Sequence, residues 1–165
     1  LNLRNVRKIL EKSLKRNFYY SSREYPYKNV VPKIICEKLM KDSLHEDLKD
    51  YKLFCFNGEV KMIQVDFDRF SNHKRNYYDK EWGLLNLEIQ YPNDPEKQIE
   101  KPLNFEKMIS LAETLSQSHR HLRVDFYVIE EKIYFGELTF YHEAGFGNFS
   151  SIAYEQKLGE LINLS

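Results

Sequence analysis

The sequence carries no net charge, few cysteines and no long run of apolar residues. Its 25 basic side chains balance 25 acidic ones among 165 residues, so it offers no general attraction to nucleic acid or to an anionic membrane. Its apolar runs are far shorter than the roughly 20 residues needed to cross a bilayer. These absences predict a protein with no membrane span and no nucleic-acid partner, in which any recognition of charge is local.

The two cysteines, Cys36 and Cys55, lie in apolar, strand-like segments. That setting predicts reduced thiols packed in the core of a cytoplasmic protein, in preference to a disulfide.

Several catalytic motifs are also missing. The sequence contains no Walker loop, nucleophile elbow or Ser-His-Asp order, and its histidines do not follow the spacing of zinc ligands. His119 and His121 are expected at the end of a helix, where a histidine complements the helix dipole. His142 is of more interest, because it opens a glycine-containing loop.

The length suits one domain with a core of its own, spanning residues 1–165. An amphipathic pattern predicts a helix over residues 5–17. Strands are expected at residues 33–39 and 51–56, and Asn57-Gly58 predicts a hairpin turn into a further strand over residues 59–67.

Residues 71–102 predict a long excursion with at most short strands, of the kind that is usually functional or packs on a neighbour. Asn104 is then expected to cap a helix running to about Ser118, whose buried stripe we predict from its apolar spacing. That stripe comprises Phe105, Met108, Ile109, Ala112 and Leu115. Two strands joined by a tight turn at residues 130–132 follow, then a loop and a short helix. The order of elements predicts an α+β fold, an antiparallel sheet flanked by helices.

The chemistry is concentrated in the last two predicted strands. Side chains alternate along a strand, so Arg123 and Asp125 share one face, and the hairpin can bring Glu137 beside Asp125. Two adjacent carboxylates ionise together at low cost only with a cation between them. Magnesium prefers such oxygen ligands, usually together with nucleotide phosphates, and Arg123 could reach a phosphate. On spacing alone, a solvated face with cross-strand ion pairs is the better interpretation. The strongly apolar opposite face favours a site.

These segments resemble the metal-binding end of the ATP-grasp superfamily, in which an Arg-x-Asp strand precedes a Glu-x-Asn strand and a loop ending in glycine. The resemblance implies that Asp125 and Glu137 hold magnesium. Thr139 stands where the family usually has the asparagine, as a weak or water-mediated third ligand. Either Gly145 or Gly147 would be the glycine of the loop that faces the acceptor substrate.

Further segments resemble the TupA-like branch of that superfamily, over roughly residues 20–162. They are DYKLFCFNGEV, DFDRF, YDKEW, RVDFY and YFGELTF. The resemblance implies that Glu37, Lys38 and Leu39 contact adenine, and that the region of Asp50 and Lys52 meets the ribose. It also places Arg69, with Arg75 as a second candidate, where the family has phosphate-directed arginines.

The implied function is that of an ATP- and Mg-dependent ligase, which forms an acyl phosphate that an amine then attacks. The branch is associated with cell-surface polysaccharide and teichuronopeptide synthesis, so the acceptor is expected to be a small molecule or a glycan. Nothing before Lys33 resembles the family's lysine strand or its glycine-rich loop, and the chain begins at Leu1 without a methionine. We therefore expect the C-terminal part of an ATP-grasp fold, completed by a missing N-terminal half or by an oligomer. A degenerate domain that only binds, and a metal-dependent glycosyltransferase of the same pathway, are the alternatives.

Overall fold

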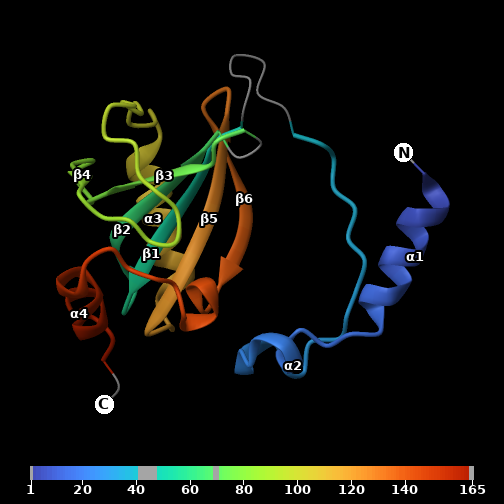
Figure 1. Ribbon diagram of the computed structural model, residues 1–165. Helices are drawn as coiled ribbons and strands as arrows, with labels where there is room; N and C mark the ends of the chain where they lie inside the picture. The colour runs from blue at the N-terminus through green and yellow to red at the C-terminus, as the bar shows by residue number, and fades with distance from the viewer. Residues whose placement is uncertain (1, 41–47, 69–70, 164–165) are drawn as a thin grey trace. The chain divides into compact units, whose positions relative to one another are not determined.

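The computed structural model describes residues 2–40, 48–68 and 71–163 (Figure 1). The chain divides into two compact units, residues 1–39 and 40–165, and each is described by itself. Within the described residues, no helix is long and apolar enough to cross a membrane.

The first unit is helical at its start and irregular at its end. Helix α1 spans Leu3–Leu14, and the Asn2 side chain caps it by accepting hydrogen bonds from the backbone N–H groups of Arg4 and Asn5. The short helix α2 (Tyr19–Ser22) and the 3₁₀ turn η1 (Tyr25–Tyr27) follow. The helix predicted at residues 5–17 is therefore confirmed, but it begins and ends earlier than expected.

The strand predicted at residues 33–39 is wrong. These residues belong to no helix or strand. Within the described chain no neighbouring strand hydrogen-bonds to them, and an apolar alternation alone cannot form a ladder. Cys36, expected in the core, is exposed, whereas Cys55 is buried as predicted.

The second unit is a sheet with strand order β4-β3-β2-β1-β5-β6, in which each neighbouring pair is antiparallel (Figure 1). Its strands are β1 (Asp50–Phe56), β2 (Glu59–Phe67), β3 (Lys74–Tyr78), β4 (Leu84–Leu85), β5 (His121–Ile129) and β6 (Lys132–Thr139). The helices are α3 (Phe105–Ser116) and α4 (Ile152–Glu160), and the short turn η2 (His142–Gly145) follows β6. The predicted α+β architecture with an antiparallel sheet is confirmed.

One face of the sheet packs against α3 and forms the main core. Leu53, Val65 and Val124 have no exposed surface, and they join Met108 and Ala112 of the helix in a single apolar cluster. Of the predicted helical stripe, Leu115 is the exception: it is 42% exposed, because the apolar face of α3 is narrower than the sequence periodicity suggests. Asn104 occupies the N-cap position, but its side chain donates to the Glu131 carbonyl instead of capping the helix.

The opposite face of the sheet is divided in two. At one end a second apolar cluster contains Phe54, Met62, Tyr77 and Ile89, and Leu158 of α4 packs against it. The remainder of this face carries buried charged side chains. It is this polar half of the sheet that holds the candidate site.

Two tight turns set the strand registers. Asn57 and Gly58 have φ values of 51° and 82°, and Glu130 and Glu131 have 48° and 63°, as two-residue type I′ hairpin turns require. Both turns lie where the sequence predicts them. Within the predicted excursion, residues 74–78 form β3 and only 84–85 form a further strand.

We predict that Ile109→Ala lowers the free energy of unfolding by about 2–5 kcal/mol, because Ile109 is 4% exposed in the α3 core. Leu115→Ala, an aliphatic truncation in the same helix, should cost about 1 kcal/mol or less because that side chain is already partly in water. Urea denaturation of both variants measures the difference. Equal losses would place Leu115 in the core, contrary to the structure.

Candidate functional site

The candidate site is a patch of charged side chains spread across neighbouring strands on one face of the sheet. In one row of cross-strand partners Arg75 lies opposite Asp66, and Asp66 lies opposite Asp50. In the next row Gln64 lies opposite Lys52, which lies opposite Asp125. Side chains directly opposite one another have Cβ atoms about 5 Å apart, so the register brings these groups within reach of one another.

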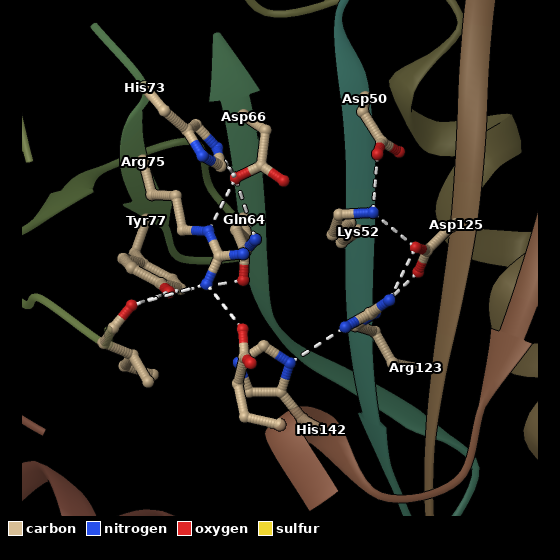
Figure 2. A network of polar contacts seen from close by, with 12 residues as sticks. Asp50, Lys52, Gln64, Asp66, His73, Arg75, Tyr77, Arg123, Asp125 and His142 are labelled. Atoms are coloured by element: carbon tan, nitrogen blue, oxygen red, sulfur yellow. Dashed lines mark hydrogen bonds and ion pairs between the residues drawn. The ribbon is translucent and has the colours of Figure 1, made fainter. Parts of the chain in front are cut away.

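Arg123 and Asp125 form the centre of the first half of the patch (Figure 2). The Arg123 guanidinium binds Asp125 through two parallel hydrogen bonds, Nε to Oδ1 and Nη2 to Oδ2, each 2.8 Å long. The same Nη2 donates to Glu137 Oε1 at 2.9 Å. Carboxylates from β5 and β6 therefore converge on a single nitrogen atom.

Lys52 holds Asp125 from the other side. Its Nζ lies 2.5 Å from Asp125 Oδ2 and 2.6 Å from Asp50 Oδ2, and all three side chains are 8% exposed or less. Burial alone would lower the pKa of Arg123, but its hydrogen bond to Asp125 and the charge of that carboxylate raise the pKa above its ordinary value. Each buried charge in this half therefore has an opposite charge as its direct neighbour.

A bulge in the β5–β6 pairing places Glu137 on this face. Val124 pairs with Leu138, whereas Phe126 pairs with Phe135, so two residues of β6 lie opposite Asp125. Gly136 permits this, because a Cβ there would lie 3.1 Å from the Asp125 carbonyl oxygen. Glu137 remains the most accessible acid of the group, with 63% of its side chain exposed.

Asp66 and Arg75 form the centre of the second half (Figure 2). Arg75 Nε donates to Asp66 Oδ1 at 2.8 Å, and Gln64 Nε2 donates to the same oxygen at 3.0 Å. His73 Nε2 lies 3.4 Å from that oxygen as well. The Tyr77 hydroxyl donates to Gln64 Oε1 at 3.2 Å.

The turn η2, after β6, touches both halves. Arg123 Nη1 lies 2.8 Å from His142 Nδ1, and Arg75 Nη1 donates to Glu143 Oε1 at 3.0 Å. A guanidinium only donates, so Nδ1 is the acceptor and the proton of neutral His142 is on Nε2. Burial and the positive charge of Arg123 lower the pKa of His142 to about 3, which keeps the ring neutral.

The structure brings together most, but not all, of the residues predicted from the sequence. Asp50, Lys52, Arg123, Asp125, Glu137 and Thr139 all lie in the first half of the patch, and Thr139 Oγ1 donates to Glu137 Oε1 at 3.1 Å. Arg69 lies outside the described residues. Glu37, Lys38 and Leu39 belong to the first unit and are exposed.

Sequence reasoning missed most of the second half. Of its members only Arg75 was a candidate, while Asp66, Gln64 and His73 carried no prediction. The signal was present in the alternation of Gln64 and Asp66 along β2, two polar side chains among the apolar residues of the second half of that strand. His121, expected at a helix end, instead begins β5, and burial lowers its pKa.

The pKa of His142 predicts an acid sensitivity. From about pH 6.5 down to about 3, the unfolded chain binds a proton on His142 that the folded chain does not, so stability falls as the pH falls through this window. His142→Asn offers Arg123 an oxygen near the Nδ1 position but does not titrate.

We expect the free energy of unfolding of the wild type to fall more steeply between pH 6.5 and 4 than that of His142→Asn. The difference in slope should be up to about 1.4 kcal/mol per pH unit. Urea denaturation of both chains across this range measures it. Parallel curves would show that His142 takes up its proton equally well in the folded protein.

A family model matches nearly the whole chain. No curated protein and no solved structure matches the chain. The family model described as TupA-like ATPgrasp matches residues 1–163, a range that includes both units and every residue of the charged patch. The Arg-x-Asp pattern lies in β5 and the Glu-x-Thr pattern in β6, at the centre of the patch. The chain belongs to the TupA-like ATP-grasp family.

Proposed function

We propose that this chain is an ATP- and Mg²⁺-dependent ligase domain that activates a carboxylate as an acyl phosphate for attack by an amine. One observation carries the proposal: Asp125 Oδ2 and Glu137 Oε1 converge on the same Arg123 nitrogen, at 2.8 and 2.9 Å. Membership of the ATP-grasp family supports a ligase-type domain. We extend the proposal to an acceptor from cell-surface polysaccharide synthesis, as the resemblance to the TupA-like branch implies.

The donor set fits magnesium bound together with a nucleotide. Within the described residues, no group of three or more His, Cys, Asp or Glu side chains is arranged to hold a metal. Magnesium commonly uses one or two carboxylates and takes its remaining ligands from phosphates and water. Asp125 and Glu137 would supply the protein ligands, and Thr139, whose hydroxyl contacts Glu137, would assist directly or through water.

Magnesium held by Asp125 and Glu137 would supply positive charge that offsets the charge developing on the transferred phosphoryl group. The chain's own residues perform the rest. With Glu137 engaged as a metal ligand, the Nη2 N–H of Arg123 that now meets Glu137 would be available to a phosphoryl or acyl oxygen. The Nε contact to Asp125 would continue to orient the guanidinium. Lys52, between Asp50 and Asp125, adds a second positive charge beside the same oxygens.

Two displacement steps make up the proposed reaction. A carboxylate oxygen of one substrate attacks the γ-phosphorus of ATP, and ADP leaves. The amine of the second substrate then attacks the acyl carbon, phosphate leaves, and the amine gives up a proton. The proposed partners of the transferred phosphoryl group are Arg123 and Arg69. The proposed adenine contacts are Glu37, Lys38 and Leu39. The ribose and phosphates are proposed to meet Asp50 and Lys52.

The test uses Glu137, because it is the metal candidate with the most exposed side chain and its replacement leaves the buried ion pairs intact. We predict that Glu137→Gln weakens magnesium-dependent ATP binding about tenfold or more, as expected when one of two charged ligands is lost. Binding of ATP without magnesium should change little. Isothermal titration calorimetry of ATP with and without MgCl₂ measures both.

Glu131→Gln is the matched control, since it removes an exposed acid from the turn of the same hairpin. It should bind Mg-ATP as the wild type does. Equally weakened Mg-ATP binding in both variants would show that any lost negative charge has this effect, and would contradict a specific metal ligand at Glu137. Binding of a nucleotide sugar in preference to ATP would refute the ligase and favour the glycosyltransferase alternative.

A further inference from the structure

Arg75 is held more rigidly than a surface arginine. It is 8% exposed, its Nε is fixed by Asp66 at 2.8 Å, and its guanidinium carbon lies 4.4 Å from the centre of the Tyr91 ring. Nη1 also lies 3.5 Å from the Ile89 carbonyl oxygen. A guanidinium fixed in this way presents its remaining N–H groups in one direction at little entropic cost.

The side chain that meets Arg75 from the loop is Glu143, and the backbone there is strained. Glu143 and the following Ala144 have φ values of 48° and 54°, a left-handed conformation that costs about 1–2 kcal/mol for each ordinary residue. Gly147 packs closely against this loop, because a Cβ at that position would lie 3.3 Å from the Glu143 Cβ. Such strain persists only where surrounding contacts hold it, and it gathers at functional sites.

The two carboxylates on Arg75 differ in how easily each is replaced. The Asp66 side chain is 1% exposed and lies on β2, so it is a permanent part of the sheet face. The Glu143 side chain is 33% exposed and lies on the strained turn. A carboxylate arriving from solvent can therefore take the place of Glu143 without disturbing Asp66.

We propose that Arg75 is the binding site for a carboxylate group of the acceptor substrate, and that Glu143 occupies this site as an internal substitute until the substrate displaces it. This inference rests on the proposed ligase function and names a chemical feature of its acceptor. The group that Arg75 binds is a single carboxylate with one negative charge, like that of the Glu143 side chain, and the rest of the substrate lies beyond this site.

Charge balance favours a carboxylate over a phosphate. Asp66 already pairs with Arg75 from inside the protein, so a ligand with one negative charge meets less repulsion from that carboxylate than a ligand with two. A dianionic phosphate beside the buried Asp66 carboxylate would add like-charge repulsion. The group that the fold itself places on Nη1 is a carboxylate, at hydrogen-bonding distance.

Displacement of Glu143 would also change the first half of the patch. His142 precedes Glu143 in the same turn and accepts a hydrogen bond from Arg123 at 2.8 Å. When the acceptor releases the turn, Arg123 Nη1 loses this partner and becomes available to the reacting oxygens. Acceptor binding is in this way coupled to the arginine beside the proposed magnesium carboxylates.

The test is titration of glutarate into the ¹⁵N-labelled full chain, followed by NMR at the Arg75 Nε–H and at the backbone amides of residues 142–145. In Glu143→Gln the internal competitor is uncharged, and we expect glutarate to bind about fivefold more tightly than in the wild type, the size expected for one partly exposed ion pair. Glu96→Gln, which removes an exposed acid without a described contact, should behave as the wild type. The double variant Glu143→Gln/Arg75→Lys keeps a positive charge beside Asp66 but lacks the planar guanidinium. It should not bind glutarate more tightly than the wild type does.

Equal affinity in the wild type and Glu143→Gln, no response to glutarate in either chain, or equally tight binding of inorganic phosphate would overturn the carboxylate site. Calorimetry with Mg-ATP on the same samples separates this inference from the proposed function. Normal Mg-ATP binding without a glutarate response overturns the acceptor site alone. A glutarate response without any Mg-ATP binding overturns the ligase proposal and leaves a carboxylate-binding domain.

Discussion

The bidentate pairing of Arg123 with Asp125 is the interaction on which the candidate site depends. A buried carboxylate is tolerated only when opposite charges and hydrogen bonds surround it, and Asp125 has Arg123 on one side and Lys52 on the other. Removal of Arg123 or Lys52 would leave a buried negative charge at the centre of the sheet without full compensation. The pair in turn orients Arg123 toward Glu137 and His142, so the positions of the outer groups follow from the inner one.

The sheet serves two purposes with its two faces. The face against α3 is a continuous apolar core that supplies the stability, and this frees half of the opposite face to carry charges that contribute little net stability of their own. Opposite charges from neighbouring strands compensate one another there in the absence of any ligand. In the proposed function, a nucleotide, a metal or an anionic substrate would enter by exchanging partners with groups already in position, so no buried charge would lose its partner in either state.

The parts of the site that follow from local pattern were predictable. Alternation along the strands placed Arg123 with Asp125, and the turn at residues 130–132 predicted that β6 returns beside β5. The face on which Glu137 lies depends in addition on the bulge opposite Asp125. The parts of the site that depend on contacts with neighbouring strands could not be predicted from local pattern. The Asp66–Arg75 pair requires the register between β2 and β3, and residues 33–39 have a strand-like pattern without a described partner strand. Leu115 fits the helical period but lies beyond the edge of the contact with the sheet.

By itself, the sequence determined the α+β class, the two tight turns and the identity of the central carboxylates, because turn chemistry and side-chain alternation are local properties of the chain. Tertiary structure alone decided which charges meet. A bulge opposite Asp125 positions Glu137, and the return of the chain after β6 places His142 on Arg123 and Glu143 on Arg75. Those contacts join residues up to 68 positions apart, and such pairings are set by strand order and register, which no short-range pattern encodes.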